Sequence, residues 1–215
     1  MRVKLEKNSA LIVVDIQYDF LPGGSLEVKN GDKIIDGVNS LMEKFYYNNC
    51  LIILTQDWHP KNHKSFASQY PGKKPMDPIT TEGLGPVLWP DHCIQGTKGA
   101  EIHEKINKNL AHLILRKGFN TNIDSYSAFY ENDKKTKTGL TGFLKDKNIQ
   151  FVYICGLALD FCCFYTAKDA KKDGFEVWFV QDLMEGIDIP QGNIQNVLNH
   201  LNSIGVKIIE YNSIY

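Results

Sequence analysis

The hydrophobic positions of the chain gather into six short runs that are rich in apolar and β-branched residues. The first of them, ALIVVDI, is apolar at nearly every position rather than at alternate positions, which is typical of a strand covered on both faces of a sheet. We therefore predict six buried strands, at residues 10–16, 50–55, 110–115, 150–155, 175–181 and 206–211.

The segments between these runs are helical in pattern. Residues 32–48 carry apolar side chains three and four positions apart, the spacing of a helix that packs one face on a sheet; these are Ile35, Val38, Leu41, Met42 and Phe45. Further helices are predicted at 140–147, 164–172 and 192–204. Strands that alternate with helices indicate a parallel sheet with helices on both faces. We predict a single-domain, three-layer α/β/α fold over residues 1–215, with a mostly parallel six-stranded sheet.

One long segment breaks this rhythm. Residues 57–90 show no clear periodicity and contain prolines at positions 60, 71, 75, 78, 86 and 90. Long irregular segments inside a compact domain are more often functional loops than simple connections. We expect this region, up to about residue 98, to contribute to a site.

Composition narrows the functional classes. The 215 residues are 43% hydrophobic, enough for a real core, and the formal net charge is −1, which gives no electrostatic footprint for nucleic acid or an anionic membrane. No apolar run approaches the roughly 18 residues of a membrane span, and no signal peptide precedes the first strand. Five scattered cysteines are not a disulfide framework. We expect a cytoplasmic protein without nucleic-acid or membrane partners.

Polar residues follow four of the predicted strands, at the edge where α/β sheets bind ligands. They are Asp15, Asp57, Lys117 and Cys162. Each alone also fits a turn, a cap or a solvated charge. Asp15, however, is flanked by apolar residues and would be costly to bury without a partner, for which Lys117 is suited. An aspartate, a lysine and a cysteine in one pocket predict an activated-nucleophile site.

The cysteine lies in GLALDFCC, between the predicted strand at 150–155 and the helix at 164–172. Unpaired amides and the helix dipole favour a thiolate at a helix N-terminus. The alternative is that Cys162 and Cys163 are two small buried hydrophobes. Because neighbouring side chains on a helix diverge by roughly 100°, only one of the two is expected to face a crevice.

The long loop carries residues of metal-binding type. Asp57 and His59 lie two positions apart and point to one side of an extended chain, and His63 and His92 follow. A carboxylate and two imidazoles suit Zn, Mn or Fe(II). Histidines in a loop are also commonly plain polar residues, so the spacing alone leaves both interpretations open.

Taken together, the motifs resemble the nicotinamidase family of the isochorismatase-like cysteine hydrolase superfamily. The resemblance spans nearly the whole chain, and the DWH and WPDHC elements separate it from the broader superfamily. The segments that carry it are VVDIQYDFLPGGSL from Val13, TQDWHPKNHKSF from Thr55, LWPDHCIQGTKGAE from Leu88, KGFNTNIDSYSAF from Lys117 and GLALDFCC from Gly156.

The resemblance implies the roles of the reacting groups. Cys162 matches the nucleophile, Asp15 the proton acceptor and general acid, and Lys117 the residue that stabilises charge beside them. The backbone amides of Ala158 and Cys162 match the oxyanion hole, and the Leu157–Ala158 peptide is expected to be cis.

It also implies the binding residues. Asp57, His59 and His92 match the ligands of one divalent metal ion, expected to be Zn with Mn or Fe as alternatives, while His63 matches either a further ligand or a hydrogen-bonding residue. The pyridine ring of the substrate is expected between two aromatic side chains and beside a third; these are Phe20, Trp89 and Tyr126.

The implied activity is that of an amidohydrolase acting on a linear carboxamide. Nicotinamide, and also pyrazinamide, would be hydrolysed through a cysteine thioester, in NAD salvage, with the metal on the pyridine nitrogen. Leu159 and Phe161 depart from the residues common in the family. The alternatives are another small-amide hydrolase, an isochorismatase, or a non-catalytic ligand-binding member; a homo-oligomer is left open. A dinucleotide-binding oxidoreductase is disfavoured because no G-x-G-x-x-G follows the first strand.

Overall fold

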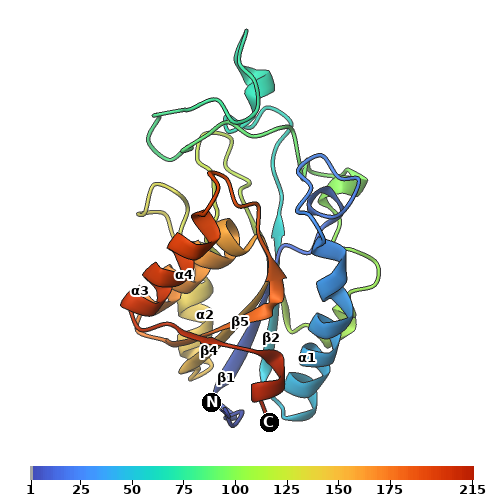
Figure 1. Ribbon diagram of the computed structural model, residues 1–215, viewed down its shortest axis with the longest axis vertical. Coiled ribbons are helices and arrows are strands. Elements are labelled where there is room, and N and C mark those ends of the chain that lie inside the picture. Colours follow the sequence, from blue (N-terminus) through green and yellow to red (C-terminus); the bar gives the residue numbers. More distant parts are fainter. Residues whose placement is uncertain (1) are drawn as a thin grey trace.

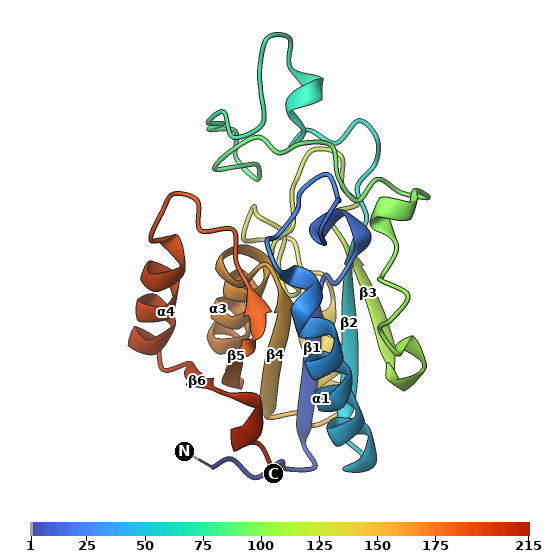
Figure 2. The same ribbon diagram turned by 45° about the vertical axis from the view of Figure 1, so that its right-hand side comes forward.

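The computed structural model describes residues 2–215 and contains one six-stranded sheet in which all strands are parallel. The order of the strands is β3-β2-β1-β4-β5-β6, which Figure 2 shows. The strands are β1 (Ser9–Val14), β2 (Leu51–Asp57), β3 (Leu113–Lys117), β4 (Phe151–Leu157), β5 (Glu176–Glu185) and β6 (Lys207–Ile209). The predicted parallel α/β fold is confirmed.

The central strand shows why the sequence is apolar at successive positions. All six residues of β1 are buried, and the strand pairs with β2 on one side and β4 on the other. In register, Ala10 lies between Leu51 and Val152. Because helices cover both faces of the sheet, neither side of β1 reaches solvent.

The helices form the two outer layers. They are α1 (Ile35–Tyr47), α2 (Leu140–Asp146), α3 (Phe164–Lys172) and α4 (Asn193–Ser203). Figure 1 shows α1 on one face of the sheet and the other three helices on the opposite face. Each face has its own hydrophobic core, and the apolar residues predicted to face the sheet from α1 are all buried.

The bounds of all six strands differ from the prediction by one to a few residues; β6 is only three residues long, and β3 and β5 are displaced or extended. The third begins three residues later than expected, because a 3₁₀ turn at Lys108–Leu110 precedes it, and it runs on to include Lys117. The fifth continues to Glu185 rather than ending at 181, since the exposed pair Gln181 and Asp182 interrupts its apolar pattern without ending the strand.

The irregular segment between β2 and β3 lies above the carboxyl ends of the strands, while both termini lie at the opposite end (Figures 1 and 2). Isolated β-bridges join parts of this segment to one another, among them His59 to Ile94 and Phe66 to Trp89. This segment therefore covers the carboxyl edge of the sheet. Among residues 2–215, no helix has both the length and the apolar character that crossing a membrane requires.

Candidate active site

The four polar residues predicted to meet at the strand ends do meet. Lys117 Nζ lies 2.8 Å from Asp15 Oδ2, 2.6 Å from Asp57 Oδ1 and 3.5 Å from Cys162 Sγ. Asp15 follows β1, Asp57 and Lys117 end β2 and β3, and Cys162 lies in a π-helical turn between β4 and α3. The parallel sheet brings the groups together because all its strands end at one edge.

Lys117 is a fully buried cation whose charge is retained by its partners. Burial disfavours the ammonium, but Asp15, Asp57 and Cys162 outweigh it and raise the pKa of Lys117 well above its ordinary value. A further hydrogen bond from Nζ to the Ser125 carbonyl, 2.9 Å long, satisfies another donor. Lys117 is therefore a fixed positive charge at the centre of the cluster.

The pKa values of the two carboxyl groups, Asp15 and Asp57, are shifted in opposite directions. Burial, together with the charge of Asp57, raises the pKa of Asp15 against the pull of Lys117. For Asp57, burial is outweighed by Lys117, His59 and His92, which hold its pKa well below the ordinary range. When environments push two carboxyl groups apart in this way, the one with the raised pKa is suited to exchange protons. That group is Asp15.

Asp15 is also held in one orientation. Thr55 Oγ1 donates to Asp15 Oδ1 at 2.5 Å and accepts the backbone N–H of Asp15 at 3.1 Å. The Asp15 backbone takes up a left-handed conformation, with φ of 46°, where the chain leaves β1. Non-glycine residues adopt this region rarely, and functional sites are among the places where they do.

The surroundings of Cys162 act in both directions on the thiolate that a helix N-terminus is expected to favour. Burial raises the pKa of the Cys162 thiol well above its ordinary value, and Asp15 and Asp57 add to this against Lys117. Two carboxylates and one ammonium already leave the cluster negative, so a thiolate, as a third anion beside them, is disfavoured. Asp15, which lies in the same cluster within 4.8 Å of the sulfur, is placed to accept the thiol proton.

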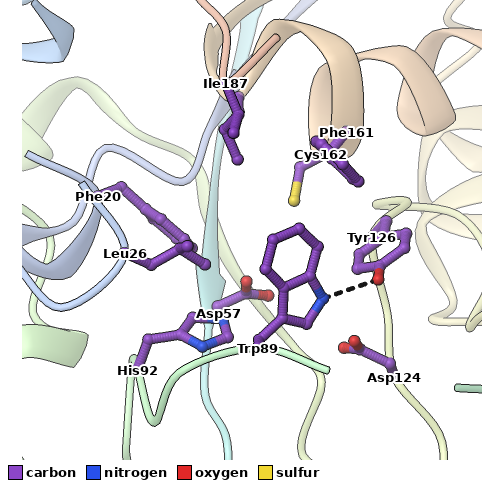
Figure 3. A pocket seen from close by; sticks show the side chains of 11 residues that line it. Phe20, Leu26, Asp57, Trp89, His92, Asp124, Tyr126, Phe161, Cys162 and Ile187 are labelled. Carbon is purple, nitrogen blue, oxygen red and sulfur yellow. Dashed lines mark hydrogen bonds between the residues drawn. The ribbon is translucent and has the colours of Figure 1, made fainter. Parts of the chain in front are cut away.

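Only one of the adjacent cysteines faces the pocket, as predicted. Cys162 lines the pocket and its sulfur points into it (Figure 3). Cys163 is fully buried among the apolar side chains of the core beneath α3 and α4. Burial also raises the pKa of Cys163 well above its ordinary value.

The turn that presents Cys162 has an unusual backbone. The Leu157–Ala158 peptide is cis, as the resemblance implied. The amides of Phe161 and Cys163 both donate to the Ala158 carbonyl, at 3.1 Å each. The amide of Cys162 lies between these two and does not share that acceptor. Its pairing with the Ala158 amide as an oxyanion hole stays a prediction.

The predicted metal ligands lie together at the other side of Lys117. The ligand atoms of Asp57, His59 and His92 fall within 4.8 Å of one another, and all three residues are buried. His59 Nδ1 lies 2.8 Å from the Gly118 carbonyl, and His92 Nδ1 lies 2.8 Å from the Pro90 carbonyl. Because a carbonyl only accepts, both Nδ1 atoms carry the proton.

This arrangement turns the Nε2 atoms of both imidazoles toward the cluster, as in metal-binding histidines oriented by carbonyl groups, and His59 Nε2 lies 3.7 Å from Asp57 Oδ2. The close approach depends on Gly118, where a Cβ atom would lie 2.4 Å from the His59 ring. Two imidazole nitrogens and the second oxygen of Asp57 are the donors that a catalytic divalent cation takes from a protein. The residues present therefore fit such an ion.

Unlike His59 and His92, His63 has hydrogen-bond partners at both ring nitrogens. Its Nδ1 accepts the N–H of Ser65 at 3.2 Å and lies 2.7 Å from the Ser65 hydroxyl, while Nε2 lies 3.3 Å from the Ile123 carbonyl. Both ring nitrogens thus have protein partners. His63 is placed with His59 and Asp124, rather than with the Asp57, His59 and His92 group. His63 thus makes hydrogen bonds in this structure and also belongs to a second group, with His59 and Asp124, whose ligand atoms lie within 4.8 Å of one another, so both of its predicted roles stay predictions.

The three aromatic residues expected around a substrate ring line the same pocket as Cys162 (Figure 3). Trp89 Nε1 donates to the Tyr126 hydroxyl at 2.8 Å, which in turn donates to the Gly85 carbonyl at 2.9 Å. These bonds fix the orientation of both rings. Phe20 lies across the pocket from Trp89, so the space between them is a slot suited to a flat ring.

Sequence reasoning missed several residues of the site. Leu26, Asp124 and Ile187 also line the pocket; Leu26 and Asp124 lie in segments that carry the resemblance but were given no role, and Ile187 lies in none of those segments. Gln17 was missed as well: its side chain accepts the Asp57 N–H and donates to the Asp57 carbonyl, both at 2.8 Å. A fully buried amide just after the first strand was the available signal.

Comparison with known proteins places this geometry in a family. The isochorismatase domain model matches residues 9–212. The chain is 47% identical to the nicotinamidase of Acinetobacter baylyi, over 100% of this chain and 98% of that protein. The chain belongs to the nicotinamidase family of isochorismatase-like hydrolases.

Two solved structures extend the comparison. The nicotinamidase and pyrazinamidase of Acinetobacter baumanii superposes with a TM-score of 0.92 at 47% identity, covering 96% of this chain and 98% of that chain. The pyrazinamidase of Pyrococcus horikoshii in complex with zinc gives a TM-score of 0.75 at 36% identity, covering 94% and 99%. As a member of the nicotinamidase family, this chain is an amidohydrolase.

Proposed function

We propose that this amidohydrolase converts nicotinamide to nicotinate and ammonia through a thioester on Cys162. The observation that carries the proposal is the buried cluster of Asp15, Lys117 and Cys162, which opens into a flat aromatic slot beside Asp57 and two imidazole nitrogens. Nicotinamide has a flat ring, a ring nitrogen for a metal and a carboxamide for a thiol.

In the first half of the reaction, Asp15 accepts the thiol proton of Cys162 as the sulfur attacks the carboxamide carbon. The raised pKa of Asp15 and the raised pKa of Cys162 favour a transfer that accompanies attack, rather than a preformed thiolate. The new C–S bond gives a tetrahedral oxyanion. As it collapses, Asp15 returns the proton to the departing nitrogen, the C–N bond breaks and ammonia leaves.

In the second half, water attacks the thioester carbon while Asp15 takes its proton. The C–S bond then breaks, nicotinate forms, and Cys162 recovers a proton from Asp15. The same carboxyl group thus serves as base and acid in both halves. Thr55 keeps it aligned throughout through its 2.5 Å hydrogen bond.

Lys117 and the turn at Cys162 would stabilise the charges that develop. The ammonium lies 3.5 Å from the sulfur and 2.8 Å from Asp15, so it offsets negative charge on either group without moving. The amides of Ala158 and Cys162 are proposed to donate to the oxyanion. Preorganised donors of this kind are commonly worth about 3–4 kcal/mol each in the transition state.

Asp57, His59 and His92 are proposed to hold one divalent cation, and the loop at about 57–98 supplies most of that site. Zinc is proposed because a carboxylate and two imidazoles are common zinc ligands and because the Pyrococcus relative was solved with zinc. When bound, the ion supplies a Lewis-acid contact for the pyridine nitrogen. Lys117 holds Asp57 in its charged form for this purpose.

Two wider proposals follow from the same relatives and residues. Pyrazinamide, which keeps the flat ring, ring nitrogen and carboxamide, is expected as a second substrate. The five cysteines are all free, which supports a cytoplasmic place of action in the recovery of nicotinamide for NAD.

The experiment that tests the proposal is ammonia release by the purified protein from nicotinamide, pyrazinamide and benzamide, with and without a chelator. We expect nicotinamide to be hydrolysed much faster than benzamide, which lacks the ring nitrogen, and the chelator to remove that advantage. Equal rates on nicotinamide and benzamide would exclude a role for the metal in recognition. No ammonia from either pyridine or pyrazine carboxamide would overturn the proposed function.

A further inference from the structure

The turn that carries the nucleophile, Leu159–Cys163, contains a buried carboxylate that takes no part in the chemistry described above. We call this segment the nucleophile turn. Asp160 precedes Cys162 by two residues, is 2% exposed, and does not line the pocket. Its oxygens accept two hydrogen bonds from the segment between β5 and α4 and one from the first residue of α4. Asp160 Oδ1 accepts the Ile187 N–H at 2.9 Å, and Oδ2 accepts the Asp188 N–H at 2.9 Å and Asn193 Nδ2 at 3.0 Å.

The loop that receives these bonds, residues 186–192, lies tightly against the turn. A Cβ atom at Gly186 would come within 3.0 Å of Asp160 Oδ1 and 2.7 Å of the Ile194 side chain. Asp188 contributes a separate anchor, since its Oδ1 accepts the Ile194 N–H at 3.0 Å. That second anchor joins the loop to α4, whereas Asp160 joins both the loop and Asn193, the first residue of α4, to the nucleophile turn.

The same loop supplies one wall of the pocket. Ile187 points into the pocket on the side nearest Cys162, as Figure 3 shows. Its own backbone amide is one of the groups bound by Asp160. The position of this wall is therefore set directly by the turn that carries the nucleophile.

We propose that Asp160 is a positioning residue that holds Ile187 in fixed register with Cys162, so that the substrate slot is closed at the reacting end. The inference rests on the proposed function and deepens it, because it assigns part of substrate binding to a carboxylate that touches no substrate. Hydrogen bonds from amides to a buried carboxylate are charge-assisted and among the stronger ones in proteins.

The expected signature is a change in KM rather than in kcat. Asp160→Ala removes the anchor of Ile187 but leaves Asp15, Lys117 and Cys162 in place, so the chemical step is retained. We expect KM for nicotinamide to rise by about tenfold, with kcat within about threefold of the wild type. Ile187→Ala is expected to raise KM by a similar factor.

A double-mutant cycle separates positioning from general weakening of the fold. If Asp160 acts through Ile187, the variant with both substitutions has the KM of either single variant, because the second change removes nothing more. Asp182→Ala is the matched control. Asp182 also anchors a neighbouring segment, through a 2.8 Å bond from the Tyr211 N–H, but it is exposed and lies outside the pocket. This control is expected to keep the wild-type KM.

Hydrogen exchange of the Ile187 and Asp188 amides gives a readout that needs no turnover. Both amides are expected to be protected in the wild type and in Asp182→Ala, and to exchange much faster in Asp160→Ala. Asp160→Asn, which keeps one acceptor oxygen, is expected to be intermediate in exchange and in KM, and serves if the alanine variant does not fold.

Three results would overturn the proposal: an unchanged KM in folded Asp160→Ala, multiplied effects in the double variant, or unaltered exchange at residues 187 and 188. Failure of the proposed function is distinguishable. In that case wild-type protein releases no ammonia from nicotinamide, while the exchange experiment still reports whether Asp160 anchors the loop.

Discussion

Replacing Lys117 by methionine removes the ammonium that lies between Asp15 and Asp57 and keeps most of the side chain's volume. Both ion pairs are fully buried at the lysine, with Nζ to oxygen distances of 2.8 and 2.6 Å. Removing one partner of a buried pair costs roughly 3–5 kcal/mol, because the remaining charge is left without compensation. For a domain of this size that corresponds to a fall in Tm of about 6–20 °C.

The pH dependence of this loss has a definite sign. In the wild type the pKa of Asp57 is depressed, so its contribution to stability is present above the unfolded pKa and is lost as pH falls. In Lys117→Met that contribution disappears: the folded pKa of Asp57 becomes raised and that of Asp15, already raised, rises further, so the variant loses less stability at low pH than at neutral pH. The difference in Tm between wild type and variant is therefore expected to be largest near neutral pH and to shrink toward pH ~4.

The assay is thermal unfolding of both proteins after treatment with a chelator, so that no bound ion compensates Asp57. Lys135→Met is the matched control: Lys135 and Glu82 form an ion pair of 2.9 Å whose side chains are 78% and 77% exposed. Exposed pairs contribute little, so this variant is expected to unfold within about 2 °C of the wild type. A Lys117→Met protein as stable as the control at neutral pH, or a difference that grows on acidification, would refute the reasoning.

Three further changes probe single groups of the site. Cys162→Ala should release no ammonia while its circular dichroism is unchanged. Cys163→Ala should lose about 1–2 kcal/mol of stability and hydrolyse nicotinamide at a near wild-type rate. The reverse pattern would contradict the assignment of Cys162 as the nucleophile. Thr55→Val removes a bond that lowers the pKa of Asp15, so the acid limb of the pH profile of kcat/KM should move to higher pH, and a downward shift would count against Asp15 as the base. Trp89→Phe should raise KM about fivefold through loss of its N–H bond, with kcat little changed.

The sheet was predictable because its signal is local. β1 is covered on both faces and is therefore apolar throughout, and α1 buries the residues that its spacing marks. A parallel sheet also places every strand end at one edge, so Asp15, Asp57 and Lys117 could be expected to meet before any side chain was seen.

Other features depend on contacts that no local pattern contains. Ile187 lines the pocket, and its amide is bound by Asp160, which is distant in the sequence. The surroundings of Cys162 could not be read from the sequence either, because the burial and the two carboxylates that raise its pKa against the helix dipole come from distant segments. Charge balance in a buried cluster depends on the full set of neighbours, which only the folded chain supplies.

The most direct test of the mechanism is to identify the atom that becomes acylated. Wild-type protein mixed with nicotinamide is quenched with acid during turnover, and its intact mass and peptides are determined. The account predicts one nicotinoyl group per chain, on the peptide that contains Cys162, and none in Cys162→Ala. An acyl group on another residue, or ammonia release at the wild-type rate by Cys162→Ala, would contradict it.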